Sequence, residues 1–365
     1  MVGIPLYVLP LPESPFILLN ILSFLALLLL GWYCLKHFPE IPKWFIWGWV
    51  FTAPWVMNFS THVVNPSYVL FGAVIFFVGI FELIPPLSKN VIPPGLAMAM
   101  VGFGLFWIFQ LHMSWIIITP HILLVLYLQL KDKRKKFLKL ILCFMGGSLS
   151  TGIFVLPTYI KYGFIQGSGG TGANVQFEMK NLLNIFAVIA RFLSFASFEI
   201  ARFAGAGTVS RLAFLKEYFW VTPFIVFAAI IGFAQVVIML IKLFKKEREK
   251  SWKLLKSLTG GTIFLVYLGS IFSIKGPSAH TFYLMLPLAM FYFFYAFKDY
   301  LKASLWKKIA VALFVSGLIV HIGLAIRNYK ERSLYKNREI VVKAIQKKDF
   351  TILGERRKTK SGIGY

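Results

Sequence analysis

The sequence predicts an all-α, polytopic integral membrane protein, and its composition is the first reason. Hydrophobic residues make up 58% of the 365 residues and charged residues only 15%, against roughly 25% charged residues in ordinary soluble domains. Phe, Trp and Tyr together supply 17% of the chain. No soluble fold of this length has enough interior to bury that much apolar surface. The composition therefore excludes a soluble enzyme, a disordered chain and a disulfide-stapled secreted domain.

The second reason is the length of the apolar segments, because a bilayer-spanning helix needs about 20 mostly apolar residues. We expect about ten transmembrane helices, and no basic region that would indicate a signal peptide precedes the first of them. The predicted spans are 16–35, 44–59, 66–84, 93–109, 116–130, 137–156, 218–243, 258–274, 282–297 and 309–326.

The third reason is the placement of Lys and Arg, which also predicts the orientation. If the run Lys131–Lys136 is cytoplasmic, the other cytoplasmic loops follow by alternation. The five inner loops 36–43, 85–92, 131–136, 244–257 and 298–308 then carry 2, 1, 5, 6 and 4 basic residues. The outer segments 1–15, 60–65, 110–115 and 275–281 carry 0, 0, 0 and 1. This asymmetry follows the positive-inside rule and predicts an inner cell membrane location with the active face extracytoplasmic.

Residues 157–217 form a long outer loop in this topology, and long loops of this kind are usually functional or disordered. Its second half is apolar but carries Arg191, Glu199 and Arg202 at spacings that suit one polar helix face. We expect an amphipathic helix on the outer membrane surface there. An eleventh span is the alternative, but it would place the basic loop 245–256 outside, against the charge rule.

The chain divides into a transmembrane helical domain, 1–326, and a polar tail, 327–365. The tail carries 12 Lys and Arg residues. The number of spans places it outside the membrane on the extracytoplasmic side, where charges in long terminal segments count less toward topology.

The formal net charge of +25 raises the question of nucleic-acid binding. Here the basic residues stand in short runs between apolar spans, so the partner they predict is the lipid bilayer, not a nucleic acid. Cys34 and Cys143 both lie within predicted spans, and the sequence has no metal-binding or redox motif. A Walker loop, a dinucleotide fingerprint and a nucleophile elbow are absent too.

The rare polar residues gather at the outer ends of the spans, and ionisable groups at membrane depth often mark function. Lys275-Gly276-Pro277-Ser278-Ala279-His280 places a cation, a turn and an imidazole between two spans, which suits a phosphate-binding loop. Any single histidine at a helix end can instead be an interfacial residue without a function. The candidate binding residues are His62, Asn65, Gln110, His112, Lys275 and His280.

The order of these features resembles the GT-C membrane glycosyltransferases. The resemblance rests on the stretch from Asn58 to Tyr68, on Gln110–Trp115 before a Pro-containing span, and on the outer loop with Pro277, His280, Tyr283 and Pro287. In style the chain resembles bacterial relatives of the dolichyl-phosphate-mannose protein mannosyltransferases and the lipid A aminoarabinose transferases.

The resemblance implies transfer of a sugar from a polyprenyl-phosphate donor to a glycan, lipid or protein acceptor on the outer membrane face. Lys275, His280 and His112 would then serve the departing phosphate, and His62, Asn65 and Gln110 would bind sugar hydroxyls. The family also implies a first span and an acidic outer loop, whose Asp acts as general base or metal ligand. The chain opens at Gly3–Tyr7, which resembles the stretch just after that loop.

We therefore expect a longer protein of which this chain is the C-terminal majority, with the catalytic residue and any divalent-metal ligands outside it. No cofactor is identified within the chain. Two other functions stay open: a transporter or flippase of lipid-linked sugars, and a non-catalytic membrane partner in envelope glycan assembly. A transporter requires polar groups through the middle of the membrane, and the predicted spans carry few there.

Overall fold

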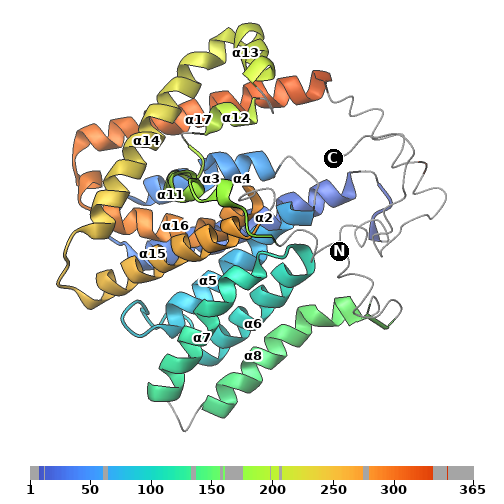
Figure 1. Cartoon of the computed structure of the whole chain (residues 1–365), viewed down its shortest axis with the longest axis vertical. Helices are drawn as coiled ribbons and strands as arrows, with labels where there is room; N and C mark the ends of the chain where they lie inside the picture. The colour runs from blue at the N-terminus through green and yellow to red at the C-terminus, as the bar shows by residue number, and fades with distance from the viewer. Residues whose placement is uncertain are drawn as a thin grey trace.

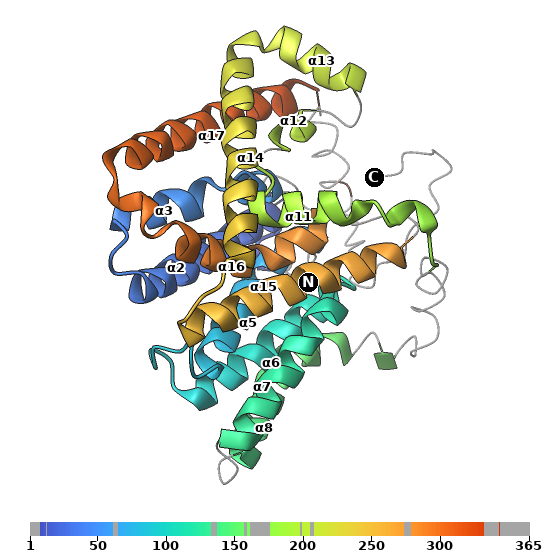
Figure 2. The same cartoon turned by 60° about the vertical axis from the view of Figure 1, so that its left-hand side comes forward.

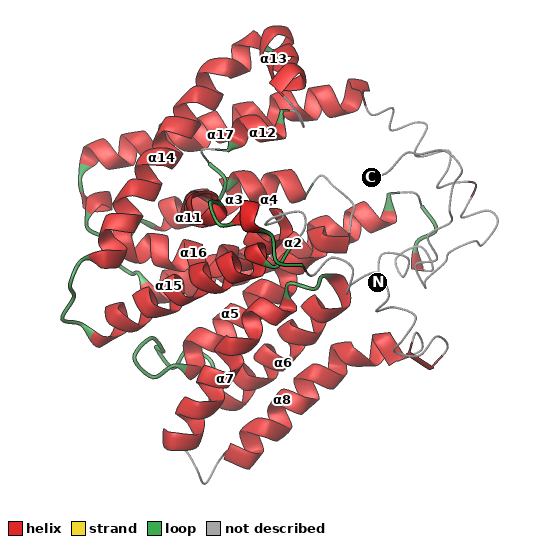
Figure 3. Cartoon of the chain, viewed as in Figure 1, coloured by secondary structure: helices red, strands yellow, loops and turns green. Residues whose placement is uncertain are grey.

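The computed structural model describes residues 8–11, 13–60, 65–132, 137–156, 159–160, 176–197, 199–204, 208–273, 279–331 and 343. Within these residues the regular secondary structure is helical, as Figure 3 shows. The prediction of an all-α fold is confirmed.

Eight helices among the described residues are long and apolar enough to cross a membrane, which indicates a multi-pass membrane protein. Each overlaps one of the predicted spans. The eight are α2 (Ser14–His37), α5 (Val69–Leu83), α6 (Pro94–Leu111), α8 (Phe137–Gly152), α14 (Thr222–Phe244), α15 (Lys250–Ile271), α16 (Ala279–Phe297) and α17 (Ser304–Glu331). The apolar spans of α5 and α8 include the 3-10 turns that adjoin them, so they run over Pro66–Leu83 and Phe137–Val155. Several begin with Pro in the first turn, where its missing N–H has no intrahelical partner to lose.

The other two predicted spans differ from the expectation. The segment 116–130 lies in α7 (Trp115–Asp132), which has Pro120 inside it and whose apolar part, Trp115–Lys131, is shorter than the eight spans. The segment 44–59 is not one continuous helix, because it divides into α3 (Lys43–Thr52) and α4 (Pro54–Phe59). Ala53 between them has ψ 124°, the extended conformation that a residue before proline prefers.

Helices α5, α6 and α8 form a layer held together by glycines, which we call the glycine seam. A Cβ added at Gly102 of α6 would lie 2.2 Å from the carbonyl oxygen of Phe144 on α8. One added at Gly147 of α8 would lie 2.0 Å from the carbonyl oxygen of Ala99 on α6. Gly104 of α6 meets the backbone of α5 in the same way. Small residues allow this close backbone approach, which drives helix association in lipid.

Helices α2, α3, α5 and α16 meet in a core of aromatic rings, which we call the aromatic core. Trp49 of α3 stacks on Phe293 of α16 with ring centroids 4.2 Å apart and planes 4° from parallel. Phe291 of α16 stacks on Phe81 of α5 at 4.4 Å. All of these rings are buried, and α16 is the most enclosed of the long helices. The aromatic core therefore fixes α16, whose first turn contributes to the site described below.

The loop segment 157–217 contains helices α11 (Asn184–Ser194), α12 (Ile200–Phe203) and α13 (Thr208–Glu217) among its described residues. Helix α11 packs against α14, α15 and α16, as Figure 2 shows. Arg191 of α11 is buried, while Leu183 and Phe186 near its start are exposed. The charged residue thus faces the bundle rather than solvent, and the predicted amphipathic surface helix stays a prediction.

The connections after α5, α14 and α16 lie on the left of Figure 1, and α2 begins and α17 ends on the right. These three connections belong to the basic loops predicted to be cytoplasmic, so they share one side of the bundle. Helix α17 continues to Glu331, beyond the predicted end of the transmembrane domain at 326. Apart from residue 343, the rest of the tail lies outside the described residues.

Candidate functional site

Four helix ends bring the candidate site together: the ends of α4 and α6 and the beginnings of α7 and α16. The hydroxyl groups of Ser114, just before α7, and Thr281, in the first turn of α16, lie 3.0 Å apart in a buried hydrogen bond. This contact joins two segments separated by 167 positions in the chain. It places His112 and His280, each close to one of these hydroxyls in the sequence, beside each other.

We call His112 and His280 the histidine pair. Their ring centroids lie 5.5 Å apart with the planes at 67°, an edge-to-face arrangement. Phe59, the last residue of α4, lies 5.3 Å from the His280 ring and stacks on Tyr283 at 4.4 Å. Two imidazoles with an aromatic wall can offer hydrogen bonds to a ligand and exclude water from it.

The ring of His112 is held in place by the backbone. His112 ends α6 in an extended conformation, and its Nδ1 accepts the N–H of Ser114 at 3.1 Å. In the neutral ring the proton is therefore on Nε2, which is a donor. Burial lowers the pKa of His112 from its usual value, so the neutral ring is the form present at pH 7.

One ring nitrogen of His280 is not used in a hydrogen bond among the described residues. Its Nδ1 is buried and has no hydrogen-bond partner among the described residues. Buried polar atoms almost always have a partner, and an exception calls for an explanation such as a bound water, an ion or a ligand. The free Nδ1 is the feature of the site that points most directly to a bound molecule.

The structure places the other predicted site residues as follows. Gln110 donates its amide N–H groups to the carbonyl oxygens of Phe106 at 3.0 Å and Thr151 at 2.7 Å. Gln110 thus ties α6 to α8, and its binding of a sugar stays a prediction. The backbone of Asn65 begins a short 3-10 helix, but its side chain is not described. His62 and Lys275 lie outside the described residues.

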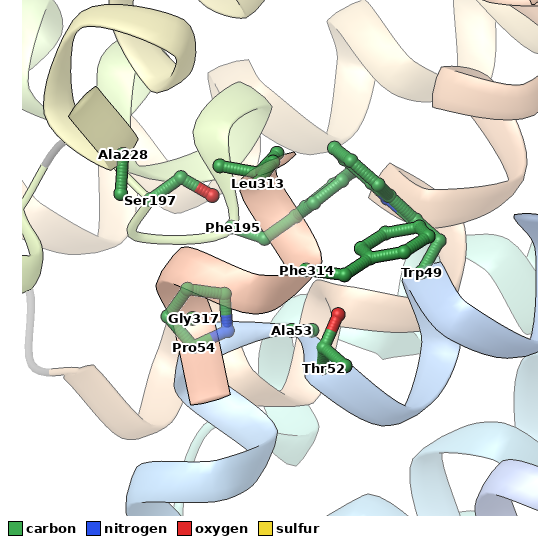
Figure 4. Close-up of a pocket in the computed structure, with 10 residues that line it drawn as sticks. All are labelled: Trp49, Thr52, Ala53, Pro54, Phe195, Ser197, Ala228, Leu313, Phe314 and Gly317. Atoms are coloured by element: carbon green, nitrogen blue, oxygen red, sulfur yellow. The ribbon is translucent and has the colours of Figure 1, made fainter. Parts of the chain in front are cut away.

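A pocket lies where two helix breaks meet (Figure 4). Thr52, Ala53 and Pro54 contribute the break between α3 and α4, and Phe195 and Ser197 contribute the break after α11. The remaining lining residues are Trp49, Ala228, Leu313, Phe314 and Gly317. Interrupted helices at membrane depth are tolerated only where they are buried in protein or line a cavity.

One feature of the site was missed by sequence reasoning: Arg191 and Glu199 pair with each other inside the bundle. The Arg191 Nε and Glu199 Oε1 atoms lie 2.7 Å apart, with side-chain exposures of 5% and 11%. The signal in the sequence was the charged residues Arg191, Glu199 and Arg202 in an apolar segment, which we interpreted as one polar face of a helix on the outer membrane surface. The break between α11 and α12 folds them together instead.

Among the described residues, no group of three or more His, Cys, Asp and Glu side chains is placed to hold a metal ion. The chain matches no family model, no curated protein and no solved structure. The function of the chain is therefore inferred from the residues themselves.

Proposed function

We propose that the protein is a membrane glycosyltransferase of the GT-C type, which transfers a sugar from a polyprenyl-phosphate donor to an acceptor. The observation that carries the proposal is the half-buried histidine pair, in which the buried Nδ1 of His280 has no hydrogen-bond partner among the described residues. The departing lipid phosphate gains negative charge, and donors aimed at it stabilise the transition state. The Nε2–H of His112 is such a donor.

The aromatic wall supports the same proposal. Phe59 and Tyr283 stack beside His280 and give the site an apolar face next to its polar one. Ligand sites combine mostly apolar walls with a few placed polar groups in this way. In the proposed site His62, Asn65 and Gln110 bind sugar hydroxyls, and Lys275 joins the histidine pair at the phosphate.

The experiment is a donor-cleavage assay with the purified protein in lipid vesicles. A panel of radiolabelled polyprenyl-phosphate hexoses and pentoses is supplied, and release of polyprenyl phosphate is measured. We expect cleavage of at least one donor and a loss of about 100-fold or more in His112→Asn/His280→Asn. The control is His321→Asn on α17, outside the proposed site, which should keep its activity. Cleavage that is unchanged in the double variant would remove the histidine pair from the site.

We further propose that the histidine pair faces the extracytoplasmic side of the cell membrane. The basic connections on the opposite side of the bundle support this orientation, because positively charged loops stay in the cytoplasm. Cysteines introduced at Met113, which is exposed, and at Lys246 test it. A membrane-impermeant thiol reagent applied to whole cells should label Met113→Cys and spare Lys246→Cys. The reverse pattern would invert the orientation.

A transporter of lipid-linked sugars is the second candidate, and the meeting of the two helix breaks, between α3 and α4 and after α11, favours it. Transporters often bind their substrates where discontinuous helices meet near the middle of the membrane. The two functions differ in bond cleavage. A transporter moves the intact lipid-linked sugar between leaflets, whereas the transferase releases polyprenyl phosphate. Movement of the intact lipid without cleavage in the same vesicles would decide for the transporter.

A further inference from the structure

The pocket where the two helix breaks meet lies at membrane depth, away from the histidine pair. Gly317, one of its lining residues, is near the middle of the apolar span Ser304–Arg327 of α17. Trp49, another lining residue, stacks on Phe293 of α16. Phe293 lies about 20 Å further along the axis of α16 than His280 does. The pocket is therefore separate from the proposed site.

The break between α3 and α4 leaves backbone carbonyl groups without the partners that a continuous helix would supply. The carbonyl oxygen of Val50 would accept the N–H four residues later, but that residue is Pro54, which has none. Among the described residues, the carbonyl oxygens of Phe51 and Thr52 accept no backbone N–H either. Unpaired backbone groups are costly where bulk water is excluded, so these oxygens require hydrogen-bond donors.

Trp49 presents a donor that lacks an acceptor. Its side chain is 7% exposed, and its indole Nε1 has no hydrogen-bond partner among the described residues. The indole N–H donates and never accepts. Thr52 and Ser197 bring hydroxyl groups to the same pocket, as Figure 4 shows. The Thr52 hydroxyl already donates to the carbonyl oxygen of Gly48 at 2.7 Å, so a ligand meets it as an acceptor.

The opposite wall of the pocket is the turn after α11. Phe195 has φ 50° and Ala196 has φ 62°, so two consecutive residues other than glycine adopt the left-handed conformation. The N–H of Ser197 closes the turn on the carbonyl oxygen of Ser194 at 2.9 Å. The Phe195 ring lies 6.4 Å from that of Trp49, measured between centroids. Strained backbone of this kind clusters at functional sites.

Chemistry selects the ligand for this pocket. The ligand must accept the indole N–H of Trp49 and donate to carbonyl or hydroxyl oxygens. A metal cation would satisfy the oxygens but would face the positive end of the N–H. An anion would accept the N–H but would repel the carbonyl oxygens. Water does both, the pocket has room for one water molecule, and buried waters typically make about three such hydrogen bonds.

We infer that the pocket is the binding site of one buried water molecule, which accepts the indole N–H of Trp49 and donates to the carbonyl oxygen of Thr52. Ser197 supplies the third hydrogen bond from the turn after α11. The water thus joins two interrupted helices by hydrogen bonds where side-chain packing alone would leave polar groups unpaired. This inference goes beyond the proposed transferase function and does not depend on it.

The first test detects the water directly. The purified protein, labelled with 15N-tryptophan in lipid bilayers, is examined by solid-state NMR for magnetisation transfer from water to the indole N–H groups. Trp49→Phe identifies the Trp49 signal. We expect transfer to Trp49 in the wild type and its loss in Gly317→Ala, whose added methyl group takes up space in the pocket. Gly261→Ala on α15, where an added Cβ meets nothing within 4 Å, is the control and should keep the transfer.

The second test replaces the water by a hydroxyl group. A Cβ added at Gly317 would lie 3.5 Å from the carbonyl oxygen of Thr52, so the hydroxyl of Gly317→Ser can donate to that oxygen. Gly317→Ala fills the same space without a donor. Although Ala is the better helix former, we expect the Tm of Gly317→Ser to be higher than that of Gly317→Ala by about 2–4 °C, because it keeps a buried hydrogen bond. At Gly261 the Ser variant should be no more stable than the Ala variant.

The outcomes that would overturn the inference are specific. One is the absence of transfer from water to Trp49 in the wild type, and another is transfer that Gly317→Ala leaves unchanged. A Tm for Gly317→Ser no higher than that of Gly317→Ala would show that the pocket needs no donor. Replacing Na+ by choline in the buffer should leave the wild-type Tm unchanged, and a fall would assign the pocket to a cation instead.

Discussion

The glycine seam and the aromatic core solve the same problem in opposite ways. Lipid tails are as apolar as the side chains of a membrane helix, so burial alone does not hold helices together. In the glycine seam, α5, α6 and α8 approach until a Cβ at Gly102 or Gly147 would meet a backbone carbonyl oxygen within 2.2 Å. In the aromatic core, the helices stay further apart and the space is filled by large rings such as Trp49 and Phe293.

The difference teaches where each half of the protein tolerates change. The glycine seam requires residues without side chains, and the aromatic core requires large side chains. A substitution that adds atoms should therefore destabilise the seam, and one that removes atoms should destabilise the core. Both regions also connect to the candidate site. The first turn of α16 carries His280, and the rest of α16 forms part of the aromatic core. The seam reaches the site through the end of α6, where His112 lies.

The largest effect is expected in the aromatic core, from Phe293→Ala. Phe293 is 3% exposed and stacks on Trp49, so its removal leaves a cavity between α3 and α16. The loss should be about 3–5 kcal/mol of the free energy of unfolding. Phe293→Leu should lose less, because it keeps more volume. Unfolding of the detergent-solubilised protein, followed by tryptophan fluorescence, measures both, and equal losses in the two variants would contradict a volume-dependent core.

The next effect is expected in the glycine seam, where adding one methyl group should destabilise. Gly147→Ala places a Cβ 2.0 Å from the carbonyl oxygen of Ala99, so α8 must move away from α6. We expect a loss of about 1–3 kcal/mol, the usual range for overpacking. Gly146 provides the matched control one position earlier, since an added Cβ there meets nothing within 4 Å. Gly146→Ala should be neutral or stabilising. Equal losses at the two glycines would show that the close approach of α6 and α8 at Gly147 does not stabilise the protein.

The sequence predicts only part of this architecture, and there is a physical reason why that part is predictable. Long apolar segments identify the eight long helices because hydropathy is a sum over about 20 residues and tolerates local errors. The break at Ala53 was missed because Trp, Phe and Val continue the apolar pattern across it. Pro54 was the available signal, but proline also occurs inside transmembrane helices, as Pro120 and Pro287 do here.

The candidate site was also predicted in part. His112 and His280 were both named from their positions at outer helix ends, and the structure brings them together. Their contact depends on the hydrogen bond between Ser114 and Thr281, which joins distant segments and has no local signature. The pairing of Arg191 with Glu199 was not predictable from spacing either. It depends on two left-handed residues, Phe195 and Ala196, and neither is a residue type that favours that conformation.

A third prediction concerns the contact between the two halves at Glu82, the buried carboxylate near the end of α5. Its oxygens accept hydrogen bonds from Tyr33 at 2.9 Å, Ser88 at 3.1 Å and the backbone N–H of Val91 at 3.0 Å. Glu82→Gln keeps the shape but turns an NH2 group toward some of these donors. We expect a loss of about 1–3 kcal/mol in the free energy of unfolding.

The control for Glu82 removes one donor at a time. Tyr33→Phe leaves the carboxylate with its loop partners, so it should cost less than Glu82→Gln. If Tyr33→Phe lost more free energy of unfolding than Glu82→Gln, the carboxylate would mainly stabilise the contact between α2 and α5. It would then contribute little to the loop that joins α5 to α6.

The smallest effect is expected at His112, where the end of the seam meets the site, and its sign follows from burial. Desolvation lowers the pKa of His112 in the folded protein below the usual 6.5. As the pH falls through about 6.5, His112 binds a proton in the unfolded chain but stays neutral in the folded protein. The free energy of unfolding therefore decreases, and it stops decreasing only below the pKa of His112 in the folded protein. Above that window the group contributes no pH dependence. Unfolding midpoints measured from pH 8 to pH 5 should therefore decline below about pH 6.5. In His112→Asn, which can still accept the N–H of Ser114 but does not titrate, the decline should be smaller, and an identical decline would place the responsible group elsewhere.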